Sequence, residues 1–184
     1  IEFASTLYQC GYHSDARRVL ERAIRDADIG LALRDPLRLQ ARLILVNVLL
    51  TVGDLNVART ILMDIDAVVK REPDSYVVLR DALDYDHASL LAQTGEFAEA
   101  SRILSDLTRD RLARGQPISA SNTYANWAAA LRSAGAHEAA LSAVRPALAL
   151  RSDGPEVFDR INADLEILLS GAWTKFKGLS AKRH

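Results

Sequence analysis

The chain of 184 residues has little of several features that define common protein classes. Its one cysteine, Cys10, excludes an internal disulfide, and no cysteine or histidine cluster has zinc-site spacing. Basic and acidic residues nearly balance, at 23 and 24, so the strong positive field of a typical nucleic-acid or membrane binder is missing. No apolar run approaches the roughly 18 to 20 residues that span a bilayer.

The signatures of common enzymes are also missing. The chain has no phosphate-binding glycine loop, no HExxH, no GxSxG and no paired CxxC. We therefore predict a protein that is not an enzyme and needs no cofactor. It begins with neither methionine nor a signal-like apolar segment, so we expect Ile1 to begin a fragment of a longer chain or a processed chain.

Alanine and leucine dominate the composition, apolar residues make up 49% of it, and the alternation typical of strands is hard to find. These features predict an all-helical protein with an ample core. The excess of arginine over lysine fits a GC-rich bacterial genome. The compartment stays open, with a bacterial cytoplasm favoured over a periplasm.

A motif recurs along the chain, anchored on glycines whose spacings are 42, 42 and 40 residues. Each glycine has a leucine four positions before it, an alanine five positions after it and an aliphatic residue nine positions after it. The glycines are Gly11, Gly53, Gly95 and Gly135, the alanines Ala16, Ala58, Ala100 and Ala140, and the aliphatic residues Leu20, Leu62, Leu104 and Val144. The four units are therefore copies of one repeat.

A second rhythm comes from Pro36, Pro73, Pro117 and Pro155, each 20 to 25 residues after a motif glycine. Proline is tolerated in the first turn of a helix, and Asp35 is a plausible cap before Pro36. Each unit therefore reads as a first helix, a glycine turn and a second helix. In the third unit we expect helices at about 75–93 and 97–113. Pro146, inside the second helix of the fourth unit, should kink or divide that helix.

The glycine lets the first helix end in a left-handed conformation, and the alanine is small enough for the two helices to approach closely. Neither helix can bury its apolar stripe alone, so successive hairpins must stack.

With its glycine, alanine and apolar positions, as in Gly95, Ala100, Leu104 and Leu107, the chain resembles the tetratricopeptide repeat (TPR) superfamily over residues 1–151. The repeats exceed the family's usual length and resemble those of bacterial regulators. The resemblance implies a right-handed α-solenoid of antiparallel hairpins, with about four repeats and a C-terminal capping helix. We expect one domain over residues 1–170, followed by a basic and aromatic cap or tail over 171–184.

The resemblance further implies that the first helix of each repeat lines a concave groove that binds a protein or peptide. The corresponding positions are Asn47 and Leu50; Tyr85, Ser89 and Gln93; and Asn122, Ala125, Ala129 and Arg132, with Asn126 adjacent. Asn122 and Asn126 are four residues apart and could hydrogen-bond a peptide backbone. The alternative is that they are simply solvated.

One segment, DALDYDH at 81–87, has candidate metal ligands in Asp81, Asp84 and His87. Metal binding would need further ligands from a neighbouring helix. We favour a solvated acidic face with His87 packed inward. Asp84, Tyr85 and Asp86 could also belong to a polar binding surface.

The favoured function is a non-catalytic scaffold that binds a protein or peptide, as part of a larger bacterial regulator or assembly factor. Two alternatives stay open: a ligand-sensing arm of a signalling or transcription regulator, and a periplasmic scaffold of an exopolysaccharide synthesis or export system. Self-association is also open, whereas the charge balance disfavours nucleic acid as a partner of this domain.

Overall fold

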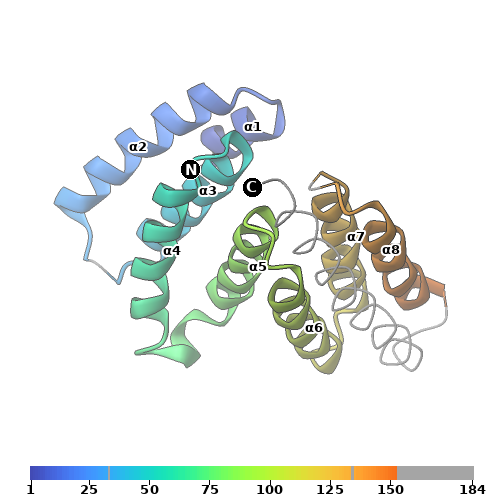
Figure 1. The fold of residues 1–184 in the computed structure, drawn as a ribbon. Coiled ribbons are helices and arrows are strands. Elements are labelled where there is room, and N and C mark those ends of the chain that lie inside the picture. The colour runs from blue at the N-terminus through green and yellow to red at the C-terminus, as the bar shows by residue number, and fades with distance from the viewer. Residues whose placement is uncertain (33, 134, 153–184) are drawn as a thin grey trace. The chain divides into compact units, whose positions relative to one another are not determined.

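The computed structural model describes residues 1–32, 34–133 and 135–152, and this part of the chain is helical without strands (Figure 1). The elements are α1 (Glu2–Gln9), α2 (His13–Gly30), α3 (Pro36–Val52), α4 (Leu55–Val69), the short 3-10 helix η1 (Pro73–Tyr76), α5 (Val77–Gln93), α6 (Phe97–Ala113), α7 (Pro117–Ser133) and α8 (His137–Ser152). The all-helical prediction is confirmed for these residues.

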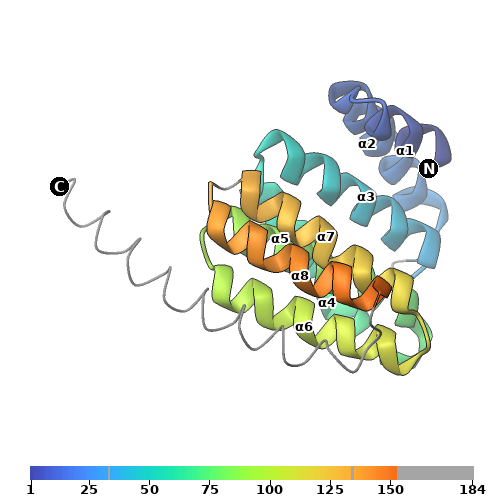
Figure 2. The same cartoon turned by 90° about the vertical axis from the view of Figure 1, so that its right-hand side faces the viewer.

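The chain forms two compact units, one over Ile1–Leu90 and one that begins at Leu91. In the first unit, α1 packs on α2, α2 on α3 and α3 on α4 (Figure 1). In the second, α6 packs on α7 and α7 packs extensively on α8 (Figure 2). Each of these packed pairs consists of helices that are consecutive in the chain.

The motif glycines adopt the left-handed backbone that the sequence predicts, with φ between 77° and 84°. Around Gly53, the N–H of Asp54 donates to the carbonyl of Leu49 at 2.9 Å, and the N–H of Gly53 reaches the carbonyl of Leu50 at 3.4 Å. This pair of hydrogen bonds is the Schellman motif, which satisfies the last carbonyls of a helix. The conserved spacing of leucine and glycine within the chain thus has a backbone cause.

The alanine five residues after the glycine belongs to the same turn. The N–H of Ala58 donates to the carbonyl of Asp54 at 3.1 Å, which is the first hydrogen bond of α4. Equivalent bonds of 2.9–3.1 Å form after Gly11, Gly95 and Gly135. The side chains of Ala16, Ala58 and Ala100 are fully buried, as expected for residues that let two helices approach closely.

A fifth turn of the same kind, which the repeat pattern did not single out, joins α6 to α7. Gly115 has φ of 70°, and the N–H of Gln116 donates to the carbonyl of Arg111 at 2.9 Å. Ala120, again five residues after the glycine, is buried and donates to the carbonyl of Gln116 at 3.0 Å. The turn therefore serves connections within and between the predicted repeats.

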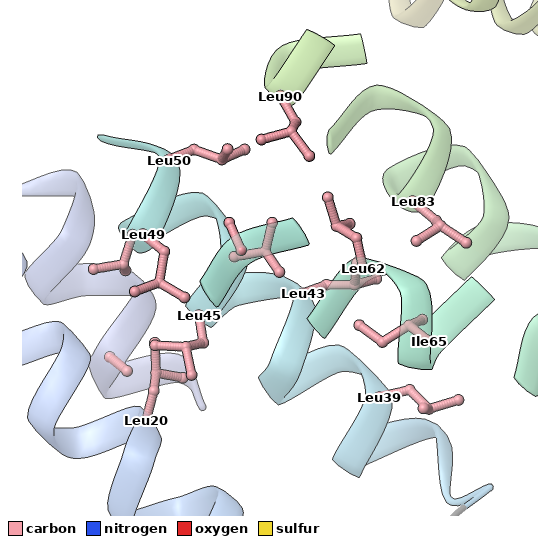
Figure 3. Packing of buried hydrophobic residues seen from close by; sticks show 14 of the residues in the cluster. Leu20, Leu39, Leu43, Leu45, Leu49, Leu50, Leu62, Ile65, Leu83 and Leu90 are labelled. Atoms are coloured by element: carbon pink, nitrogen blue, oxygen red, sulfur yellow. The ribbon is translucent and has the colours of Figure 1, made fainter. Parts of the chain in front are cut away.

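Aliphatic side chains from α2, α3, α4 and α5 fill the core of the first unit (Figure 3). Leu62 on α4 is fully buried and lies near Leu43 of α3 in Figure 3, while Leu50 and Leu90 point toward each other. Because a large buried aliphatic side chain contributes about 1.5–3 kcal/mol when removed from water, this cluster is the main source of stability in the unit.

The core of the second unit relies on alanine and on two large aromatic side chains. Tyr124 and Trp127 of α7 are almost completely buried. Ser121 of α7 donates its hydroxyl to the carbonyl of Ala147 on α8 at 2.7 Å, inside the interface. Val144 departs from the pattern, because its side chain is 38% exposed where Leu20, Leu62 and Leu104 are buried.

Most predicted helix limits are close to the observed ones. The predicted helix at 97–113 is confirmed as α6, and Asp35 caps α3 by accepting the N–H of Leu37 at 2.9 Å. The helix predicted at about 75–93 begins at Val77, because η1 precedes it. Pro146 does not divide α8, which continues to Ser152. Pro155 and the predicted cap or tail over 171–184 lie outside the described residues.

The left-handed turn makes a specific stability prediction at Gly53. A Cβ at this position would meet no atom within 4 Å, so Gly53→Ala tests the backbone conformation rather than space. We expect the free energy of unfolding in urea to fall by about 1–2 kcal/mol.

The matched control is Gly30→Ala at the end of α2, where a Cβ is also unobstructed and no positive φ is required. Because alanine favours the helix more than glycine does, this variant should be equally or more stable than the parent. Equal losses in both variants would contradict the account of the turn.

Candidate functional site

The structure distributes the predicted groove residues over α3, α5 and α7. Gln93, Asn122, Asn126 and Arg132 are exposed, and Asn47, Tyr85 and Ser89 are half-buried. These residues belong to two local arrangements, one in each unit. Some of the α7 residues line an open cleft, and Asn47 donates a hydrogen bond to a buried carboxyl group.

The cleft lies between α7 and α8 in the second unit and has a volume of about 550 Å³. Three of the predicted groove positions, Ala125, Ala129 and Arg132, line it. The other described lining residues are Ala128, His137, Ala140, Leu141 and Val144. Sequence reasoning did not select the α8 residues, because the resemblance directed attention to the first helix of each repeat.

The α7 side of the cleft is lined mostly by alanine, at Ala125, Ala128 and Ala129, so this helix fills little of the space. The α8 side carries Ala140 and the larger Leu141 and Val144. Leu141 is 73% exposed. Val144, which also lines the cleft, is 38% exposed, so the two residues together give the α8 side an apolar surface that favours an apolar contact.

The polar groups of the cleft lie beside the turn at Gly135, with Arg132 in the last turn of α7 and His137 at the start of α8. Arginine keeps its positive charge at all physiological pH values and can bind a carboxylate through two parallel N–H donors. The cleft therefore joins an apolar wall to a cationic end. Asn122 and Asn126 are exposed on the same helix, but they are not among the residues that line the cleft.

The second arrangement is a buried carboxyl group on α5. Asp86 is only 1% exposed, and its Oδ2 accepts a hydrogen bond from Nδ2 of Asn47 on α3 at 3.2 Å. The same Nδ2 also donates to the carbonyl of Leu43 at 3.1 Å. The suggestion that Asp86 belongs to a polar binding surface is therefore wrong, because its side chain faces the helix interface.

Helical spacing carried the signal for this burial. Asp86 lies three residues after Leu83 and four before Leu90, both of which are buried, so all three share one face of α5. Burial raises the pKa of Asp86 well above its ordinary value, and the hydrogen bond from Asn47 only partly opposes this shift.

Among the candidate metal ligands of α5, His87 lies near two charged residues of α4. His87 is half-buried; burial lowers its pKa, Asp66 of α4 opposes the shift, and Lys70 of α4 adds to it. Asp66 and Lys70 pair with each other at 2.7 Å. Across the described residues, no group of three or more histidine, cysteine, aspartate or glutamate side chains is placed to hold a metal ion.

No helix in the described part of the chain combines the length and apolar character needed to cross a membrane. Comparison with protein-family models, with curated proteins and with solved structures found no match to this chain. The resemblance to TPR proteins consequently stays a prediction from the repeat pattern.

The buried carboxyl group predicts a pH-dependent effect of Asp86→Asn. Because the pKa of Asp86 is raised in the folded protein, the folded state holds this proton to higher pH than the unfolded state. Protonated Asp86 therefore stabilises the folded state. This stabilisation is fully present below the pKa of the unfolded chain, about 3.9, and is lost as the pH rises through the pKa of the folded protein. Asparagine cannot ionise, so the stability of the variant relative to the parent should increase over that range.

Urea unfolding from pH 4 to pH 8 measures this difference. Asp64→Asn is the matched control, since Asp64 is exposed on α4 and its charge is not removed from water. If the stabilities of the parent and the Asp86→Asn variant changed in parallel with pH, the pKa of Asp86 would not be raised in the folded protein, which would contradict this account.

Proposed function

We propose that this protein is a non-catalytic scaffold that binds a protein or peptide segment, and that it forms part of a larger bacterial regulator or assembly factor. The observation that carries the proposal is the α7/α8 cleft. Three residues that the TPR resemblance places on a binding surface, Ala125, Ala129 and Arg132, lie together along its α7 wall.

The repeat architecture is part of the proposal. A right-handed TPR-like solenoid requires hairpins of equal construction that stack in chain order. The recurring left-handed glycine turns and the packing of consecutive helices within each unit support such an architecture. In a stack of this kind, surfaces between neighbouring helices are natural binding sites.

The cleft fits a segment in which a large apolar side chain precedes an aspartate, a glutamate or a C-terminal carboxylate. The apolar side chain would cover the alanine wall and Leu141, and the carboxylate would bind Arg132. His137 supplies a second polar group at the same end. A basic segment would place like charges together at Arg132 and is disfavoured.

A second function, a ligand-sensing arm, is favoured by the size of the cleft. Pockets for small molecules typically measure about 300–1,000 Å³ and are mostly apolar with a few polar groups. The α7/α8 cleft, at about 550 Å³, falls in this range. An apolar small molecule with a carboxylate would use the same residues as the peptide.

Selection from a random peptide display library against the full chain tests the proposal. We expect selected peptides to share an apolar residue followed by an acidic one. Leu141→Asp and Arg132→Glu should each weaken binding of those peptides at least about tenfold, equivalent to about 1.4 kcal/mol. Fluorescence anisotropy with labelled peptides measures the affinity.

Ile118→Asp is the control, because Ile118 is exposed on α7 and is not among the lining residues. Asn122→Ala/Asn126→Ala tests whether the predicted asparagine pair extends the site. Peptides that bind the Leu141→Asp and Arg132→Glu variants as tightly as the parent would overturn the assignment to this cleft. Failure to select peptides, together with binding of apolar carboxylic acids that Arg132→Glu abolishes, would favour the ligand-sensing arm.

A further inference from the structure

Two arginines of α3 are unusually enclosed in the first unit. Arg38 and Arg42 lie one helical turn apart, and their side chains are only 11% and 18% exposed. Arginine is seldom buried to this extent unless its charge is paired and its N–H groups have acceptors.

A single carboxylate serves both arginines. Oδ1 of Asp28, in the last turn of α2, is 2.5 Å from Nη2 of Arg38 and 3.5 Å from Nη2 of Arg42. Each guanidinium carries five N–H donors. The Nε of each arginine is enclosed and has no hydrogen-bond acceptor among the described residues. The cluster therefore has an excess of one positive charge and two enclosed N–H donors without acceptors.

Nearby acidic residues along the chain are engaged elsewhere. Asp35 accepts the backbone N–H of Leu37 as the cap of α3, and Glu72 pairs with Arg34. The positive end of the α3 dipole lies in the same turn as Arg38 and further favours an anion.

We propose that Arg38 and Arg42 form a binding site for a phosphate group. This site lies in the first unit and is independent of the proposed peptide cleft. A tetrahedral oxyanion has enough acceptor oxygens to bridge two guanidinium groups, each of which binds phosphate through paired N–H donors. The anion balances the excess positive charge of the pair. Asp28 holds the two side chains together and competes with the anion for the same donors.

The variant Asp28→Asn distinguishes a phosphate site from an ion cluster that only joins two helices. If phosphate competes with Asp28, then Asp28→Asn frees donors and removes a negative charge, so phosphate should bind about threefold more tightly or better. If the cluster only joins α2 to α3, then Asp28→Asn lowers stability without increasing phosphate affinity.

Titration of the full chain with inorganic phosphate tests the site. Two-dimensional NMR of the arginine Nε–H groups reports binding at each guanidinium, and sulfate, acetate and chloride at matched ionic strength serve as comparison anions. We expect saturable shifts with phosphate and sulfate, and weaker shifts with acetate. A response to acetate equal to that of phosphate would instead assign the site to carboxylates and overturn the phosphate proposal.

Arg38→Gln/Arg42→Gln should weaken phosphate binding at least about tenfold, measured by isothermal titration calorimetry. The matched control is Arg18→Gln/Arg22→Gln, because these arginines are also four residues apart but are exposed on α2. Should the first double variant fail to fold, Arg42→Lys keeps the charge but loses the planar fork, and we expect it to bind phosphate more weakly than the parent.

Phosphate also stabilises many proteins without binding a site, through exclusion from their surface. A linear, unsaturated response that is the same in the parent, Arg38→Gln/Arg42→Gln and Arg18→Gln/Arg22→Gln would therefore overturn the proposal. Unchanged or weaker phosphate binding in Asp28→Asn would do the same.

Discussion

The structure depends on one backbone constraint, the left-handed glycine that ends a helix and reverses the chain. At Gly53 and its counterparts, two hydrogen bonds close the end of one helix, and a third, donated by the N–H of the alanine five residues later, begins the next. The turn therefore sets the position at which the second helix starts against the first. An L-amino acid with a Cβ atom would adopt this backbone conformation only at a cost of about 1–2 kcal/mol.

The two candidate sites follow from how side chains of different sizes occupy the interfaces that these turns create. Between α3 and α4 the buried side chains are mostly leucine, isoleucine and valine (Figure 3). Between α7 and α8, the α7 side of the interface is lined mostly by alanine, and a cleft with a cationic end is left open. Between α2 and α3, Arg38 and Arg42 occupy an interface where apolar residues would ordinarily pack and are largely enclosed, while their partner Asp28 stays 39% exposed.

The local features of the fold could be predicted from the sequence, and the features that depend on distant helices could not. The turn at Gly95 and the helix at 97–113 follow from contacts within about six residues, so the repeat pattern was sufficient to predict them. The burial of Asp86 depends on which face of α5 meets α3, although its spacing from Leu83 and Leu90 already suggested it. Arg38 and Arg42 of α3 both pair with Asp28 of α2, and no local pattern in the sequence predicted this contact between two helices. For the cleft, the predicted α7 positions were informative, whereas the contribution of α8 required the packing to be known.

Amide hydrogen exchange of the full chain tests the central claim about the turns most directly. The N–H groups of Tyr12, Asp54, Glu96, Gln116 and Ala136 each donate to a carbonyl five residues earlier, and all five would exchange quickly in an open loop. The account predicts that each exchanges at least about a hundredfold more slowly than an unstructured amide, because the turn must open before exchange occurs. Exchange at the unstructured rate at these positions, with the flanking helices protected, would contradict it.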